Sequence, residues 1–89
     1  MRYYVMVVSV DKILAEMRSN PANIPFSDLR KVCESFFGAA RPGTGGSHRV
    51  FRTPWPGDPR VNIQDDHGKA KAYQVRQVLA AIKKLEDMP

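Results

Sequence analysis

One histidine has clear catalytic potential: His48, which lies between a glycine-rich turn, RPGTGGS (residues 41–47), and the strand-like HRVFRT. Histidine titrates near neutral pH in its unperturbed state, so it can take up or release a proton during a reaction. RNA can be cut without a metal, because its own 2′-hydroxyl can attack the adjacent phosphorus. That reaction needs a base, an acid and cations around the phosphorus. His48 could be the base or the acid, with Arg49, Lys69 or Lys71 holding the phosphate; an ordinary surface position is the alternative.

Other catalytic and ligand-binding patterns are missing from the chain. The motifs GxxxxGK[ST], GxGxxG, HExxH and CxxC do not occur, and GTGG (residues 43–46) is not followed by the lysine and helix of a phosphate-binding loop. The two histidines and the neighbouring Asp65 and Asp66 could be imagined as metal ligands, but their spacing is not diagnostic. We therefore predict no metal site and no organic cofactor, and we expect His67 to be a surface residue.

The charge distribution favours a polyanionic partner. Fourteen Lys and Arg against nine Asp and Glu give a formal net charge of +5. Most of the excess lies in the second half of the chain, on Arg49, Arg52, Arg60, Lys69, Lys71, Arg76, Lys83 and Lys84, against Asp58, Asp65 and Asp66. Lys69 and Lys71 directly precede the predicted last helix, whose N-terminal N–H groups favour phosphate. This corner is a candidate phosphate site, and a solvated helix face with ordinary lysines is the alternative.

Length and composition indicate one small soluble domain. The 89 residues are 43% hydrophobic and 26% charged, as in ordinary globular chains. The single cysteine, Cys33, allows neither an intramolecular disulfide nor a cysteine-based zinc site, which suits a reducing cytoplasm. No apolar run approaches the ~18 residues that span a bilayer, and MRYYVMVVSV lacks a small-residue cleavage site after it. We expect a cytoplasmic protein without membrane contact, with residues 1–8 as an extra strand or an extension.

Apolar spacing predicts two helices in the first half of the chain. Residues 10–17 carry apolar side chains at i, i+3, i+4 and i+7, with Ser9 or Asp11 as the N-cap. The second helix begins at Ser27 as its N-cap and ends at Gly38, which can adopt a positive φ. Its apolar stripe comprises Leu29, Val32, Cys33, Phe36 and Phe37, so Cys33 is predicted to be a core residue.

The second half predicts strands and a last helix. A first strand is expected near residues 37–42, followed by two more, 48–53 and 60–64, which form a hairpin. Residues 65–71 read as a polar connection. A helix then runs over residues 72–86, with Val75, Val78, Leu79, Ile82 and Leu85 on its buried face and Gln74, Arg76, Gln77, Lys83 and Lys84 on its other side.

These elements predict an α+β fold with two parts. Residues 1–24 would form an N-terminal extension with a short helix, and residues 25–86 an α-β-β-β-α domain. Two amphipathic helices can cover one face of a small antiparallel sheet and leave the other face to solvent. This is the arrangement of double-stranded-RNA-binding domains.

Three stretches together resemble a known family: GGSHRVFRTP, VNIQ and GKAKAYQVRQVLAAI. In this order they are similar to the HicA-type toxins of bacterial type II toxin–antitoxin modules, and the similarity covers roughly residues 11–85. NPANIPFSDLRKVCESFFG looks like the longer variety of these toxins, in which an extra helix precedes the core. The chain departs from many members at Arg49, where they have a second histidine, and at Ala72, where they often have a proline.

The resemblance implies a function and a catalytic residue. HicA-type toxins are mRNA interferases on a double-stranded-RNA-binding-like fold, and their hallmark is a Gly-Ser-His element whose histidine is catalytic. That role falls here on His48. The proposed RNA-binding residues are Ser47, Arg49, Arg52, Lys69, Lys71 and Arg76. The resemblance also implies a HicB-type antitoxin partner. The alternatives are a non-catalytic nucleic-acid-binding module on the same fold, with Trp55 for stacking, and a domain that binds an acidic protein.

Overall fold

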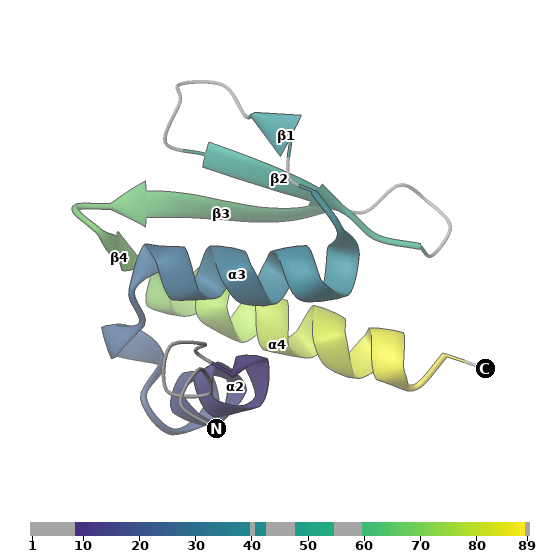
Figure 1. Ribbon diagram of the computed structural model, residues 1–89, viewed down its shortest axis with the longest axis horizontal. Coiled ribbons are helices and arrows are strands. Elements are labelled where there is room, and N and C mark those ends of the chain that lie inside the picture. Colours follow the sequence, from purple (N-terminus) through teal and green to yellow (C-terminus); the bar gives the residue numbers. More distant parts are fainter. Residues whose placement is uncertain (1–8, 40, 43–47, 55–59, 89) are drawn as a thin grey trace, which may run out of the picture.

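The protein has an α+β fold built on a four-stranded antiparallel sheet of order β1-β2-β3-β4 (Figure 1). The structure is a computed structural model, and it describes residues 9–39, 41–42, 48–54 and 60–88. The elements in chain order are α2 (Val10–Ser19), the 3-10 turn η1 (Pro21–Asn23), α3 (Phe26–Phe37), β1 (Arg41–Pro42), β2 (His48–Arg52), β3 (Arg60–Asp66), β4 (Lys69–Ala70) and α4 (Ala72–Glu86). The predicted combination of helices with an antiparallel sheet is confirmed.

The elements form three layers (Figure 1). The helix α3 packs on β2, β3 and β4, while α4 packs on β3, so both helices cover the same face of the sheet. The helix α2 packs on the far side of α3 and α4. None of the described helices packs on the opposite face of the sheet, which we call the open face.

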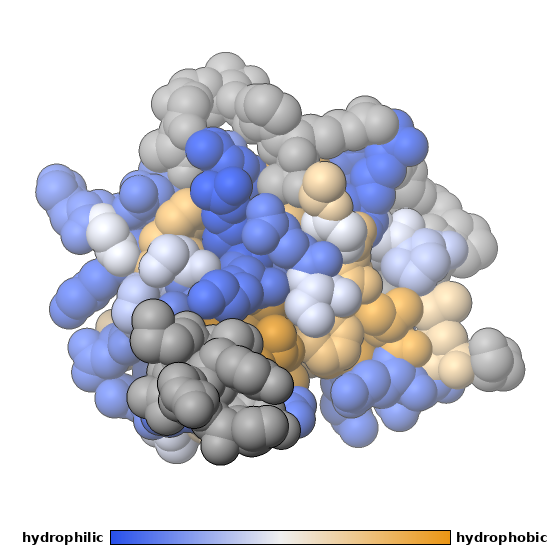
Figure 2. Space-filling view, viewed as in Figure 1, coloured by the Kyte–Doolittle hydropathy of each residue, from blue (hydrophilic) through white to orange (hydrophobic). Residues whose placement is uncertain are grey.

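A single hydrophobic core joins all three layers. Its buried members come from α2, η1–α3, the sheet and α4: Ile13, Leu14, Met17, Ile24, Phe26, Leu29, Val32, Cys33, Phe51, Val61, Ile63, Ala70, Val75, Val78 and Ile82. The helix α2 therefore contributes to the same core as the rest of the chain. Figure 2 shows hydrophilic side chains over the middle of α3 and hydrophobic ones at the surface toward the C-terminal ends of α3 and α4.

The segment that joins α2 to α3 extends the edge of the sheet. The Ala70 N–H donates to the Ile24 carbonyl (2.8 Å), and the Phe26 N–H donates to the Gly68 carbonyl (2.9 Å). Pro25 lies opposite Lys69 in an isolated antiparallel bridge. A proline is tolerated at a sheet edge because the missing N–H removes no bond from an inner ladder. The boundary predicted after residue 24 thus falls inside a paired segment.

The helix ends follow the predicted capping chemistry in two cases and depart from it in one. The Ser9 hydroxyl accepts the Asp11 N–H (3.2 Å) and caps α2. Gly38 ends α3 with a φ of 87°. The prediction that Ser27 caps α3 is wrong, since Pro25 is the N-cap and its carbonyl accepts the N–H groups of Asp28 and Leu29, both at 3.1 Å. The pairing of residues 24–26 with β4 places the start of the helix before the serine.

Residues 65–70 form a hairpin where a polar connection was predicted. The strand β3 continues to Asp66, and β4 returns after a two-residue turn at His67 and Gly68. Both turn residues have positive φ, 54° and 85°, which is the pattern of a type I′ turn. The Asp65 carboxylate accepts the Gly68 N–H (2.7 Å) and holds the turn. The first strand expected near residues 37–42 is present as β1, two residues long.

Candidate nucleic-acid interface

His48 is the first residue of β2, and its side chain belongs to the open face. Side chains alternate between the faces of a strand, and Phe51, which is fully buried, marks the face that the helices cover. His48, Val50 and Arg52 therefore share the open face. His48 is half-buried and lies directly opposite Gln64 of β3. The helices α3 and α4 begin at this same end of the sheet (Figure 1).

Arg49 lies on the covered face. It is directly opposite the buried Ile63, and its guanidinium Nη1 donates to the backbone carbonyl of His48 at 2.9 Å. From the sequence, Arg49 is expected beside His48 as a phosphate ligand. Alternation instead separates the two side chains, and the arginine fixes the peptide that carries the histidine.

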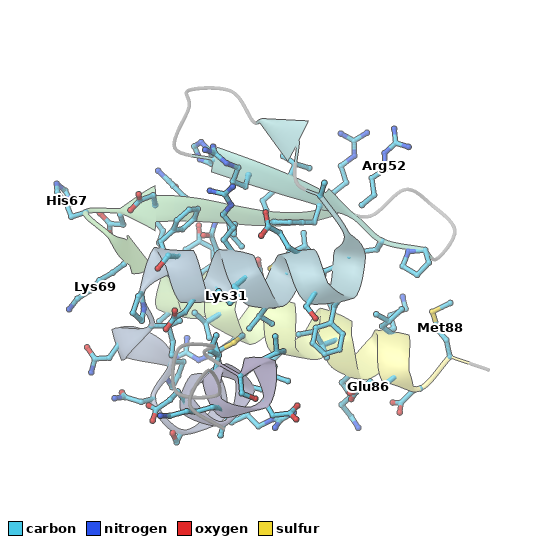
Figure 3. All side chains as sticks on the ribbon, viewed as in Figure 1. Lys31, Arg52, His67, Lys69, Glu86 and Met88 are labelled. Atoms are coloured by element: carbon cyan, nitrogen blue, oxygen red, sulfur yellow. The ribbon has the colours of Figure 1, made fainter. Side chains whose placement is uncertain are left out.

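Lys69 and Lys71 lie at the same end of the sheet as His48. Lys69 pairs with Asp66, two residues beyond Gln64 on the open face, and Figure 3 shows its side chain extending outward from the edge of the sheet. Lys71 is the N-cap of α4, and its carbonyl accepts the N–H groups of Gln74 and Val75, both at 3.0 Å. The predicted corner of two lysines beside a helix N-terminus is thus present in the fold.

Two carboxylates offset the charge of that corner. Asp65 and Asp66 belong to the same hairpin as Lys69. The Asp65 carboxylate is occupied by the turn, and a carboxylate oxygen of Asp66 lies 3.0 Å from the His67 Nδ1. The formal charges of the two lysines and two aspartates cancel, so this corner is less cationic than the sequence run suggested.

Arg52 lies at the other end of the open face. It ends β2 directly opposite Arg60, the first residue of β3, and both side chains are exposed. Figure 3 shows Arg52 leaving the sheet on the side away from α3 and α4. Arg52 lies four positions after His48 in β2, which is roughly 13 Å along the strand.

The remaining predicted RNA contacts are dispersed. Arg76 is exposed on α4, and it points about 200° around the helix from Gln74, which faces β3. Lys83, seven residues after Arg76 on the same side of α4, lines a hollow with Arg18 of α2 and Leu79. Arg76 therefore belongs to the flank of α4 toward α2. Ser47 and Trp55 lie outside the described residues.

Gln74 is a buried polar residue that sequence reasoning placed on the exposed side of the last helix. Only 5% of it is exposed. Its Oε1 accepts the backbone N–H of Gln64 (2.8 Å), and its Nε2 donates to the Tyr73 hydroxyl (3.4 Å). Because β4 ends at Ala70, the Gln64 N–H lies beyond the reach of that strand. The Gln74 side chain takes the place of a strand acceptor and ties α4 to the residue opposite His48.

The Cys33 thiol is buried in the core, and the acidic and histidine side chains of the described residues are scattered. Burial, and secondarily the nearby Glu34 carboxylate, raise the pKa of the Cys33 thiol to about 12, so it is protonated at neutral pH and its prediction as a core residue is confirmed. Among residues 9–39, 41–42, 48–54 and 60–88, no three His, Cys, Asp or Glu side chains cluster closely enough to hold a metal ion. His67 is almost fully exposed at the hairpin turn.

Within the described part of the chain, no helix combines the length and apolar character needed to cross a bilayer. Comparisons of the chain with family models, with curated proteins and with solved structures gave no match.

Proposed function

We propose that this protein is an mRNA endonuclease of the HicA type, the toxin of a type II toxin–antitoxin module, and that His48 is its general acid or base. The observation that carries the proposal is the position of His48. It is half-buried at the first residue of a strand, on the sheet face that no described helix covers. An RNA strand could therefore reach the imidazole of His48, while the backbone of this residue is held in the β2–β3 ladder.

The order of the elements supports the proposed fold family. Without α2 and the short β4, the chain runs helix, three strands, helix, with both helices on one face of the sheet. We propose that this is a double-stranded-RNA-binding-like domain, with α2 as the additional N-terminal helix and β4 as a local extension of the hairpin.

The proposed chemistry uses the RNA's own 2′-hydroxyl. Its oxygen attacks the adjacent phosphorus, the bond to the 5′ oxygen breaks, and the products carry a 2′,3′-cyclic phosphate and a 5′-hydroxyl. His48 takes the 2′ proton or gives a proton to the leaving oxygen. Lys69 and Lys71 supply cations at that end of the sheet, and Arg49 acts through the His48 carbonyl that it binds. The reaction needs neither a metal nor an organic cofactor.

The setting and the partner follow from the resemblance alone. A HicA-type toxin acts in the bacterial cytoplasm and is silenced by a HicB-type antitoxin. Growth arrest on expression, relieved by a co-expressed acidic protein encoded beside the toxin, is the expected cellular behaviour.

The test compares three proteins on one RNA. Wild type, His48→Ala and His67→Ala are incubated with a single-stranded mRNA in excess EDTA, and the chain ends are identified. His67→Ala is the matched control, since it removes the other histidine, exposed at the same end of the sheet. We expect wild type and His67→Ala to cut and leave cyclic phosphate ends, while His48→Ala is slower by about 10²–10⁴-fold. Equal cutting by all three would refute a catalytic role for His48.

A non-catalytic RNA-binding module on the same scaffold is the second candidate. One observation favours it: the cleavage needs a base and an acid, but the other described histidine is almost fully exposed and bonded to Asp66. RNA binding with a steep salt dependence, unchanged by His48→Ala and without cleavage, would favour this reading.

A further inference from the structure

Two arginines stand side by side on the open face, at the end remote from His48. Arg52 and Arg60 are directly opposite each other in the β2–β3 ladder, and both are exposed. Side chains in this relation have Cβ atoms about 4.5–5.5 Å apart, so the two guanidinium groups can reach the same anion.

Along the described residues of β2 and β3, the rest of the open face carries one histidine, one valine, two amides and one carboxylate. Among the described residues of β2 and β3, alternation gives this face His48, Val50, Arg52, Arg60, Asn62, Gln64 and Asp66. Its carboxylate, Asp66, lies beyond Gln64 at the opposite end from the arginine pair. Asn62 and Gln64, between the two ends, have amides that can donate to and accept from base edges.

We propose that Arg52 and Arg60 form a clamp for one backbone phosphate of single-stranded RNA, so that the strand runs along the open face from His48 to this pair. The planar guanidinium forks match a phosphate in geometry as well as in charge. The intervening amides favour RNA over an acidic peptide, because an acidic peptide offers no base edges to them. The position of the cut at His48 rests on the proposed function, whereas the phosphate clamp does not.

The spacing makes the clamp depend on the length of the RNA. Arg52 lies roughly 13 Å along β2 from His48, and side chains stand roughly perpendicular to a sheet. The arginine pair therefore holds a different phosphate from the one beside His48. A dinucleotide at His48 is too short to reach the clamp, and a longer strand reaches both.

The experiment measures RNA affinity in a His48→Ala background, so that the probe remains intact. Fluorescence anisotropy gives Kd for a labelled dinucleotide and a labelled octanucleotide across a salt series. The test protein adds Arg52→Gln and Arg60→Gln. The control adds Lys12→Gln and Arg18→Gln, which remove the same charge from exposed positions on α2, on the far side of the helix layer.

We expect the arginine variant to bind the octanucleotide at least tenfold more weakly than its parent, with the slope of log K against log salt reduced by about 0.7 for the lost phosphate contact. Dinucleotide binding should be unchanged, and the α2 control should keep the affinity of the parent. Equal losses in both variants, or an equal loss for both RNA lengths, would overturn the clamp. Displacement of the octanucleotide by polyglutamate as effectively as by unlabelled RNA would overturn the assignment to RNA.

The two proposals fail in different ways. If proteins with His48 intact do not cut RNA but octanucleotide binding still depends on Arg52 and Arg60, the phosphate clamp is supported and the nuclease function is refuted. If wild type cuts RNA and the arginine substitutions change neither binding nor cutting, only the phosphate clamp is refuted.

Discussion

The two faces of the β2–β3 ribbon carry side chains of opposite character. On the covered face, Phe51 and Ile63 are fully buried and Val61 is nearly so. On the open face, the same two strands carry His48, Arg52, Arg60 and Asn62. One pair of strands thus stabilises the fold on one side and offers polar side chains on the other. Since neighbours alternate, a single step along the chain separates the roles of His48 and Arg49.

The largest expected effect tests the two faces with adjacent residues. Phe51→Ala should lower the free energy of unfolding by about 3–5 kcal/mol, because it leaves a cavity under the sheet. Val50→Ala, on the open face of the same strand, should cost less than about 1 kcal/mol. Urea denaturation followed by circular dichroism measures both. Similar losses of unfolding free energy for the two variants would mean that both faces of β2 contribute equally to stability.

The next largest effect tests the hydrogen bond that ties α4 to β3. Gln74→Leu keeps the approximate volume but removes the acceptor of the Gln64 N–H, and an unpaired buried donor costs about 1–3 kcal/mol. Gln77→Leu, exposed on the same helix, should change stability by less than about 0.5 kcal/mol. Hydrogen exchange of the Gln64 amide, measured by NMR, should accelerate only in Gln74→Leu. An unchanged Gln64 amide would show that the bond does not hold β3 to α4.

The smallest effect tests the burial of the Cys33 thiol through the pH dependence of stability. Burial raises the pKa of the Cys33 thiol to about 12 in the folded protein, against 9.0 for an exposed thiol. Below pH 9 both states keep the proton; between pH 9 and 12 only the unfolded state loses it, so stability falls as the pH rises. At pH 10 the loss should be about 1 kcal/mol relative to pH 8. Cys33→Ala removes this contribution.

Urea titrations of wild type and Cys33→Ala at pH 8 and pH 10 check that slope, since the other titrating groups are common to both proteins. Parallel declines in the two proteins would contradict the burial of the thiol. At pH 8 the native thiol should also react with an alkylating agent only when urea unfolds the chain.

Much of the secondary structure could be predicted from local pattern. The last helix was expected over residues 72–86 and is found there, because its apolar spacing repeats through four turns without a breaker. Ser9 and Gly38 act as the predicted cap and stop, since both depend on neighbouring backbone groups. The start of α3 departs from the prediction because the pairing of residues 24–26 with β4 decides it, and that pairing spans more than forty residues of sequence.

The site was predictable in its residue types and not in its arrangement. His48 could be singled out from its chemistry and from the junction that it occupies. Gln74 could not, because a glutamine beside an apolar stripe is usually solvated, and only the end of β4 at Ala70 creates the N–H that it satisfies. Arg60 was one of several basic residues until the register placed it opposite Arg52.

The sequence by itself determined the hydrophobic periodicity of the helices and strands, the burial of Cys33, the positive net charge and the presence of a histidine at the start of a strand. These depend on residues within a few positions of one another. Only the tertiary structure decided which face each strand residue occupies, which arginines are neighbours and how α4 is tied to β3. Those relations depend on strand register and on packing between distant segments, where a shift of one residue moves every side chain to the other face.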